Sequence, residues 1–291
     1  MHKLKLKTRI TAILILTSLI VALGNTFLRG YEPAHLEVHF IDVGQGDCEL
    51  IIGEMGKTML IDSGVEKMSD KVIGYISSLG IKKLDYVVAT HPDSDHIGAM
   101  DKIVEHFDVD HFFMPTAVSK SSDYKELISV LGKKNLPPKA LYSGDELQFD
   151  NANMKVLSPR TDKNYNDTNS YSIVIKLIYQ NTSFMFTGDA TMENESDIVD
   201  DFDDISCDVL KLAHHGSSTS TSEYFLKRAN PTFAVISCGK NNKYRHPSKV
   251  VTKLLKKYET GIFRTDYQGS IVLKVKDHKL YSNTDPIYEY E

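Results

Sequence analysis

The chain has 291 residues, 41% of them hydrophobic, which is enough for a sizeable core and excludes a disordered protein. It carries 34 basic and 39 acidic residues, and the formal net charge of −5 excludes the overall positive field of proteins that hold nucleic acid by charge alone. The three cysteines, Cys48, Cys207 and Cys238, are odd in number and widely spaced, which fits neither a disulfide framework nor a zinc ribbon. We therefore expect one large domain or two closely packed halves.

Residues 1–30 are typical of a signal peptide or membrane anchor with a short linker. Basic residues crowd positions 3 to 9, and an uncharged stretch rich in Ile and Leu follows from Ile10 to Gly24. The stretch is short for a bilayer span of about 20 apolar residues, yet Ala22-Leu23-Gly24 is only a passable cleavage site. Both a cleaved and a retained segment stay open. Because basic residues resist translocation, either one predicts that residues 31–291 lie outside the cytoplasmic membrane, secreted or membrane-anchored.

Apolar segments separated by glycine-rich turns predict a strand-rich first half. Strands are expected at 36–43, 48–52, 57–61 and 84–89, with one helix ending at Gly80 and another at 99–107. The lysine- and serine-rich stretch 119–138 contains one short amphipathic pattern and is predicted to be a surface excursion. The second half again alternates strands and helices. Strands are expected at 154–157, 171–179, 182–186, 208–212, 232–237, 262–264 and 270–276, and helices at 192–199, 222–228 and 248–258. Two such halves indicate an α/β (α+β) protein in which sheet packs on sheet with helices outside.

Four potential metal ligands follow the predicted strand at 84–89. His91, Asp93 and Asp95 can project to one side of an extended segment, and His96 begins a helix that turns back toward them. Two carboxylates this close repel each other unless a cation compensates, and mixed nitrogen and oxygen ligands suit zinc, manganese or iron. The alternative is a polar loop that caps a helix, and capping alone does not require four ligand types.

Two later strands also end in polar residues. The strand 182–186 leads to Asp189, whose carboxylate is suited to bridging two cations or, alternatively, to capping the following helix. The strand 208–212 leads to His214 and His215. Adjacent side chains point apart, which predicts that one binds metal and the other orients it or contacts substrate. His246 precedes a helix and is either a further site residue or only a loop histidine.

Together these motifs resemble the metallo-β-lactamase superfamily, whose first metal motif is normally His-x-His-x-Asp-His, here with Asp93 at the second histidine. An ordered series of segments is similar to the extracytoplasmic hydrolase domain of ComEC-type competence proteins: Phe40–Asp47, Leu60–Gly64, Asn169-Ser170, Thr187–Asp189, His214–Ser217, His246-Pro247 and Arg264–Gly269. The resemblance implies a four-layer αββα sandwich of the metallo-β-lactamase type and a hydrolase domain that covers residues 31–291.

The resemblance also implies two divalent metal ions and their ligands. His91 and Asp93 would hold one ion, Asp189 would bridge, and the second ion would be held by Asp95, His96 and His214. The superfamily usually supplies a further histidine before the bridging aspartate, but this chain has none in the segment 166–170. Scarce nitrogen ligands favour manganese, or a weakly held second zinc, over two tightly held zinc ions. Positions beside the ligands, or contacts with substrate, are expected for Asp42, Asp62, Asn169, Ser170 and Ser217.

The predicted chemistry is metal-assisted hydrolysis, in which two cations lower the pKa of a shared water and neutralise charge on the scissile group. Asp93 or Asp95 is the expected proton shuttle. His215 and His246 are expected to donate to a phosphate oxygen or to protonate the leaving group. The ComEC-like pattern favours a phosphodiesterase, and above all a nuclease that acts on DNA outside the cytoplasmic membrane, in uptake or degradation.

Two alternatives stay open. One is a phosphodiesterase of envelope phosphorylcholine, polymers or lipids. Such enzymes resemble this chain in the segment Phe40–Gly44, but they have a histidine where this chain has Asp93. The other is a membrane-tethered adaptor on a hydrolase fold, against which the ligand set argues. The expected partners are DNA or another phosphodiester and, where the amino-terminal segment is retained, the membrane. No protein partner is indicated.

Overall fold

The computed structural model describes residues 35–288, so the segment predicted for residues 1–30 lies outside the described residues. The first half contains β1 (Leu36–Phe40), β2 (Glu49–Ile52), β3 (Thr58–Ile61), η1 (Glu66–Met68), α2 (Ser69–Ser78), β4 (Lys83–Val88), α3 (Ser94–Ile97), α4 (Met100–His106), β5 (Asp108–Phe113) and α5 (Ser122–Lys133). The second half contains β6 (Glu146–Phe149), β7 (Ala152–Ser158), η2 (Thr168–Tyr171), β8 (Val174–Tyr179), β9 (Thr182–Phe186), α6 (Met192–Asp201), β10 (Val209–Lys211), η3 (Ala213–Gly216), α7 (Glu223–Ala229), β11 (Phe233–Ile236), α8 (Lys249–Lys257), β12 (Gly261–Arg264), α9 (Thr265–Gln268), β13 (Ile271–Lys276) and β14 (Lys279–Ser282). Between residues 35 and 288, no helix has the length and apolar character needed to cross a lipid bilayer.

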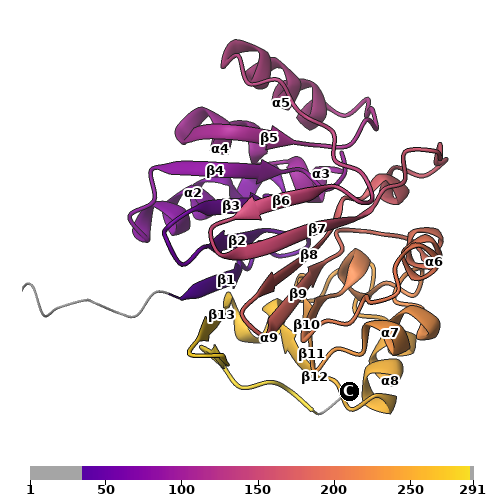
Figure 1. The fold of residues 1–291 in the computed structure, drawn as a ribbon. Coiled ribbons are helices and arrows are strands. Elements are labelled where there is room, and N and C mark those ends of the chain that lie inside the picture. The colour runs from indigo at the N-terminus through magenta and orange to yellow at the C-terminus, as the bar shows by residue number, and fades with distance from the viewer. Residues whose placement is uncertain (1–34, 289–291) are drawn as a thin grey trace, which may run out of the picture. The chain divides into compact units, whose positions relative to one another are not determined.

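The strands form two seven-stranded sheets (Figure 1). The first has the order β14-β13-β1-β2-β3-β4-β5, and its β3, β4 and β5 run parallel. The chain returns to complete this sheet with its last strands, because β13 pairs with β1 and sets Phe40 opposite Ile271. The second sheet has the order β12-β11-β10-β9-β8-β7-β6, and β9 to β12 run parallel. Its central strands are almost continuously buried, as expected for parallel strands covered on both faces.

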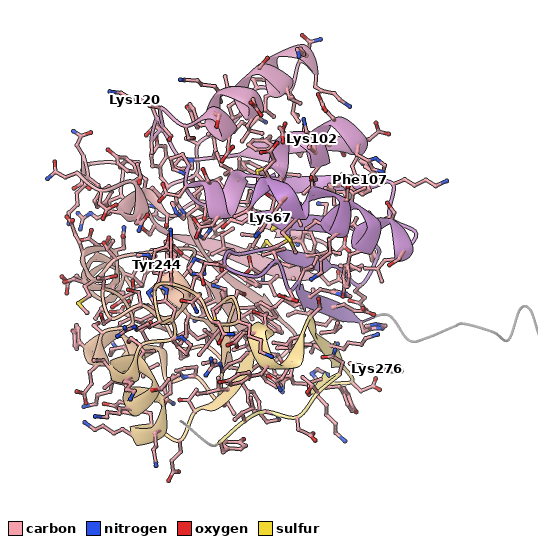
Figure 2. All side chains as sticks on the ribbon, turned by 180° about the vertical axis from the view of Figure 1, so that it is seen from behind. Lys67, Lys102, Phe107, Lys120, Tyr244 and Lys276 are labelled. Carbon is pink, nitrogen blue, oxygen red and sulfur yellow. The ribbon has the colours of Figure 1, made fainter. Side chains whose placement is uncertain are left out.

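Three apolar clusters fill the spaces between the layers. One lies between the sheets, where Phe40 packs against Phe186 with ring centroids 6.1 Å apart. The other two pack α2, α4 and α5 on the outer face of the first sheet and α6, α7 and α8 on the outer face of the second. Charged side chains such as Lys102 project from the outer helices into solvent (Figure 2). The predicted four-layer αββα sandwich is therefore confirmed for the described residues.

Two parts of the first half differ from the prediction. The stretch 119–138 is not only a surface excursion, because it contains α5, and Leu127, Val130 and Leu131 of this helix are buried in the outer cluster of the first sheet. Their helical spacing is the signal that the surrounding lysines and serines obscure. The sequence pattern also fails to predict β5, because only the last two residues of this edge strand are buried.

The strand ends that carry the predicted ligands lie together. β3 and β4 are parallel neighbours in the first sheet, and β9 and β10 are parallel neighbours in the second, so each pair ends at one edge. Gly188 brings the two edges into contact: its φ is 49°, and a Cβ atom at this position would lie 2.8 Å from Cβ of Thr90. Only glycine permits this close approach. As a result, the segment after β4 lies against the segment after β9.

Candidate metal centre

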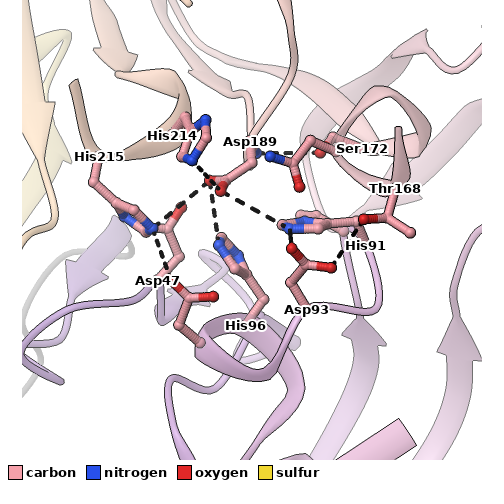
Figure 3. Close-up of polar contacts among 12 residues, drawn as sticks. Asp47, His91, Asp93, His96, Thr168, Ser172, Asp189, His214 and His215 are labelled. Carbon is pink, nitrogen blue, oxygen red and sulfur yellow. Dashed lines mark hydrogen bonds and ion pairs between the residues drawn. The ribbon is translucent and has the colours of Figure 1, made fainter. Parts of the chain in front are cut away.

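The segment after β4 carries four of the predicted ligands into the space between the strand edges (Figure 3). α3 begins directly after Asp93, and this turn of helix returns His96 to His91 with ring centroids 4.1 Å apart. Both imidazoles are fully buried, whereas the Asp93 side chain is 41% exposed. Oδ1 of Asp93 accepts a hydrogen bond of 3.0 Å from the hydroxyl of Thr168, and its Oδ2 lies 3.9 Å from Nε2 of His91. The segment therefore presents two buried imidazoles and a more open carboxylate.

Asp62, directly after β3, fixes both buried imidazoles. Its Oδ2 lies 2.7 Å from Nδ1 of His96 and accepts a hydrogen bond of 2.7 Å from the hydroxyl of Thr90. The same hydroxyl lies 3.0 Å from Nδ1 of His91. Because each Nδ1 is engaged on this side, Nε2 of both rings faces the centre, as is usual for metal-binding histidines held by a carboxylate. The structure thus places Asp62 behind the ligands, where the resemblance implies it.

Asp189 lies opposite these imidazoles. Its Oδ1 is 3.2 Å from Nε2 of His96, without the geometry of a hydrogen bond, and its Oδ2 is 3.9 Å from Nε2 of His91. The backbone N–H of Asp189 donates to the hydroxyl of Ser172 at 3.1 Å, which anchors the segment. The alternative capping role falls to Thr191, which forms a capping box at the start of α6. The two oxygens of Asp189 are therefore free to face different histidines.

His214 and His215 both approach Asp189, although adjacent side chains are expected to point apart. The expectation assumes an extended backbone, whereas both histidines adopt the left-handed conformation, with φ values of 51° and 55°. Nε2 of His214 lies 3.7 Å from Oδ2 of Asp189, and Nε2 of His215 lies 3.8 Å from Oδ1. His215 is buried and lies 3.2 Å from Oδ2 of Asp95, whereas the His214 side chain is 29% exposed. The structure therefore brings both histidines to the centre.

A buried ion pair supports His215 from behind. Nδ1 of His215 lies 2.9 Å from the carbonyl oxygen of Ser237 and 3.1 Å from Oδ1 of Asp47. Oδ2 of Asp47 accepts a hydrogen bond of 2.6 Å from Nζ of Lys211, which also donates to the carbonyl oxygen of Leu212. Burial lowers the pKa of Lys211, but the charge of Asp47 outweighs burial and the pKa is raised, so the lysine is charged. This pair fixes the ring of His215 with Nε2 toward the centre.

Negative charge dominates the centre and holds protons on two of its histidines, His215 and His96. Burial lowers the pKa of His215, but the charges of Asp189 and Asp47 outweigh it and raise the pKa to about 10. Burial also lowers the pKa of His96, and Asp189 and Asp62 raise it well above its ordinary value. A bound divalent cation would balance the same negative charge, and the two histidines would then not need to be protonated. The electrostatics of the centre therefore favour a bound cation.

The donor atoms themselves also fit a metal ion. Nε2 of His91, Nε2 of His96 and Oδ1 of Asp189 are buried and have no hydrogen-bond partner. Buried polar atoms normally have a partner, and leaving them without one costs free energy. Ligand atoms within 4.8 Å of one another are offered by His91, His96 and Asp189 and, as a second group, by Asp95, His96 and His215. Imidazole nitrogens and carboxylate oxygens at this spacing suit zinc or manganese.

His246 forms the rim of the centre. Its ring centroid lies 5.7 Å from that of His214 and 6.3 Å from that of His215. Burial and the neighbouring imidazoles of His215 and His214 lower the pKa of His246 to about 4. Its Nδ1 is buried without a hydrogen-bond partner. His246 is therefore a neighbour of the predicted ligands rather than an isolated loop histidine.

The other residues predicted to lie beside the ligands make contacts of their own. Asp42 pairs with Lys71 at 3.1 Å, and the hydroxyls of Ser170 and Ser217 bond to neighbouring threonine hydroxyls. Asn169 has a buried Oδ1 without a partner. None of these four side chains hydrogen-bonds with a predicted metal ligand in the described part of the chain. For them, contact with substrate stays a prediction.

Three residues of the centre are not predicted from the sequence. Lys211 is the lone charge in the apolar run 209–212, a pattern that indicates a buried ion pair. Asp47 is the last residue of the motif Phe40–Asp47, but the sequence does not show that it pairs with Lys211. Thr90 directly precedes His91, and no spacing rule points to its hydroxyl.

Comparisons with known proteins show the family of the chain. Residues 41–240 match the metallo-beta-lactamase superfamily. The chain is similar to ComE operon protein 3 of Bacillus subtilis (strain 168), with 30% identity over 271 residues, 87% of this chain and 35% of the relative. It is also similar to Competence protein ComA of Neisseria gonorrhoeae, with 27% identity over 233 residues, 79% of this chain and 31% of the relative. The chain thus spans about a third of the length of these relatives.

A solved structure shows the same fold. The metallo-beta-lactamase fold protein YhfI from Bacillus subtilis matches with a TM-score of 0.54 and 13% identity, covering 86% of this chain and 100% of that chain. The sequence match from residue 41 to residue 240 includes every predicted metal ligand. The chain therefore belongs to the metallo-beta-lactamase superfamily, as a hydrolase related to competence proteins.

Proposed function

We propose that this hydrolase is a two-metal phosphodiesterase that cleaves DNA outside the cytoplasmic membrane. One observation carries the proposal: the buried Nε2 atoms of His91 and His96 and the buried Oδ1 of Asp189 have no partner in a centre rich in carboxylates. Oxygen-rich sites suit the metal ions that act on phosphate groups. The relationship to competence proteins supports DNA as the substrate.

Asp189 divides the proposed centre into two halves. The inner half gathers at its Oδ1 and the outer half at its Oδ2. The inner half consists of Asp95, His96 and His215, and the outer half consists of His91, Asp93 and His214. Counting one oxygen of Asp189, each half offers two nitrogen and two oxygen ligands, a set that zinc and manganese accept. This division differs from the expected one, because His215 takes the place of His214 beside Asp95, and His214 joins the outer half. Both adjacent histidines then serve as ligands, and the shortage of nitrogen expected from the sequence is relieved.

The residues of the chain would orient the reactants around this centre. Bound metal ions would supply a water of lowered pKa and positive charge for the scissile phosphate. Asp93 is partly exposed and steadied by Thr168, so it is placed to take a proton from the attacking water. His246 lies on the rim, where a ring N–H can donate to a phosphate oxygen or to the leaving group.

The proposed location outside the membrane is supported by the basic and then apolar pattern of residues 3–24. A reporter enzyme that works only outside the cytoplasm, fused after residue 291, tests it. We expect an active fusion. An inactive but intact fusion would contradict the location and leave the chemistry untouched.

The hydrolysis is tested with purified full-length protein and four substrates: single-stranded DNA, double-stranded DNA, RNA and a small phosphodiester. Manganese, zinc and magnesium are supplied in turn. We expect cleavage of DNA by the wild type and loss of cleavage in Asp95→Ala. Asp200→Ala removes an exposed carboxylate from α6 and serves as the matched control, which should cleave normally. DNA left intact with every metal refutes the proposal, and cleavage that survives Asp95→Ala refutes the assigned centre.

A further inference from the structure

A cavity of about 750 Å³ adjoins the metal centre. Its wall is formed by residues 240–242 and 244–248, by the first turn of α8, by the last residue of β12 and by residues of α9. His246 belongs both to this wall and to the rim of the centre, because its ring lies beside those of His214 and His215. A group bound in the cavity would therefore sit next to the reacting atoms. The volume is in the range of cavities that bind small organic groups.

The cavity is positively charged, although the chain as a whole carries a formal net charge of −5. Lys240, Arg245 and Lys249 line it, and none of the three forms an ion pair within residues 35–288. The carboxylate in the wall, Asp266, is neutralised by Arg264, with N–O distances of 3.0 and 2.7 Å. Three cations are left without a protein counter-charge. Such a cavity attracts an anion, and it does so beside a centre proposed to act on phosphate.

The cavity also carries two tyrosine rings that are open to solvent. Tyr244 is 54% exposed and Tyr267 is 66% exposed. The guanidinium of Arg264 covers one face of the Tyr267 ring, with Cζ 4.1 Å from the centroid, and His246 stacks on Tyr244 at 5.6 Å. Figure 2 shows Tyr244 on the surface of the molecule. Nζ of the exposed Lys243 also lies over the Tyr244 ring, 4.9 Å from its centroid. Exposed rings with a cationic or aromatic neighbour are typical platforms for stacking a flat ligand.

The loop that presents these groups is held in one shape by Asn242. Its Nδ2 donates to the carbonyl oxygens of Gly239 and His246 at 2.9 and 2.7 Å, and its Oδ1 accepts the N–H of His246 at 2.9 Å. The N–H of Ser248 donates to the carbonyl oxygen of Gly216 at 2.8 Å, which ties the loop to the segment after His215. The cavity is therefore preorganised relative to the metal centre, and a ligand need not order it first.

We propose that this cavity is a nucleotide subsite, which stacks a base of single-stranded DNA on Tyr244 and Tyr267 and holds the adjacent phosphate with Arg245 and Lys249. Bases in a duplex are already stacked on one another, so an open aromatic platform selects a single strand. The inference rests on the proposed function and names the form of its substrate. It also explains how a protein of negative net charge holds DNA, because the positive charge is local.

The test measures binding of a fluorescent oligothymidylate of about 12 nucleotides, a length that spans typical single-strand sites. Full-length Asp95→Ala is the background, so that the strand is not cut. Adding Tyr244→Ala and Tyr267→Ala together should raise Kd by at least about tenfold, as expected for the loss of base stacking. Tyr244→Phe with Tyr267→Phe keeps the rings and should restore binding. Tyr224→Ala removes an equally exposed ring, 56% exposed on α7, and should leave Kd unchanged.

A second oligomer separates stacking from damage to the loop. It has the same sugar-phosphate backbone but lacks bases. The alanine pair should weaken binding of oligothymidylate and leave binding of the abasic oligomer nearly unchanged, whereas Arg245→Ala should weaken both and flatten the salt dependence. An equal loss with both oligomers, or no loss with either, overturns the subsite.

The wild type distinguishes this inference from the proposed hydrolysis. If the wild type cleaves a small phosphodiester but substitution of the two tyrosines does not change oligonucleotide binding, the subsite is refuted and the phosphodiesterase stands. If the wild type cleaves neither DNA nor the small diester with any metal, but the alanine pair weakens oligothymidylate binding, the hydrolysis is refuted and the subsite stands.

Discussion

The inner and outer halves of the metal centre are supported very differently. In the inner half, His96 and His215 are buried, with buried carboxylates at their Nδ1 atoms, and only Asp95 is partly exposed, at 31%. In the outer half, His91 is buried, but the side chains of Asp93 and His214 are 41% and 29% exposed. Their supports are threonine hydroxyls, at 3.0 Å from Asp93 and 3.2 Å from Nδ1 of His214.

This difference indicates a division of labour. Buried ligands held by charged partners lose little freedom when a metal binds, so the inner half should hold its ion tightly. Two of the three outer ligands are exposed and held by neutral hydroxyls, so they can shift, and the outer half should hold its ion less tightly and adjust to substrate. The following changes test this comparison, and they run from the largest expected effect to the smallest.

Asp189→Ala removes the residue that both halves share. We expect the rate of phosphodiester hydrolysis to fall by more than about 100-fold, the upper end of the loss caused by residues that only support a ligand. Metal content should fall in both halves. Hydrolysis rate and bound metal are measured together, with Asp200→Ala as the control. A variant that keeps either ion at full affinity contradicts the bridging role.

Lys211→Met leaves the charge of Asp47 buried without its partner, behind the inner half. We expect the free energy of unfolding to drop by about 3–5 kcal/mol, the usual result of removing one member of a buried ion pair. Urea denaturation measures it. Lys227→Met, which changes an exposed lysine of α7, should stay within about 0.5 kcal/mol of wild type.

The second charge can be removed as a check on this explanation. Adding Asp47→Asn to Lys211→Met should recover part of the lost stability, because no unpaired charge remains in the interior. A double variant less stable than Lys211→Met would show that the lysine acts through packing and not through charge.

Asp62→Asn removes the charge that orients His96 directly and His91 through Thr90. Metal affinity should fall about 10- to 100-fold, as is usual when the partner of a metal-binding histidine is changed. Competition with a chromogenic chelator measures it. Unchanged affinity would mean that packing alone holds the two imidazoles.

Asp93→Ala affects only the outer half. We expect its ion to bind about 5- to 10-fold more weakly, because solvent screens the charge of an exposed carboxylate. Affinity for the first equivalent should not change. The same chelator competition resolves the two equivalents, and an equal loss at both would remove the distinction between the halves.

The sequence predicts the fold well because its elements have clear patterns. The layers follow from apolar strands with helices between them, and the ligand segment follows from a strand that ends in four polar side chains. β5 escapes prediction because most of this edge strand is not buried. α5 is underestimated because its buried residues are few among lysines and serines.

The centre is only partly predictable because much of it depends on tertiary contacts. His91 and His96 can be placed from local spacing. His214 and His215 cannot, because their left-handed backbone is set by the turn that η3 makes. The pairing of Asp47 with Lys211 joins residues 164 positions apart, and no local pattern specifies it.

The central claim is most directly tested by the metal content of full-length protein purified without chelator. We predict about two equivalents of zinc or manganese per chain, as a two-metal centre requires. One should be lost on dialysis against a mild chelator, and the other should be retained in wild type and lost in His96→Ala. A wild-type protein that holds well under one equivalent of transition metal would contradict the account.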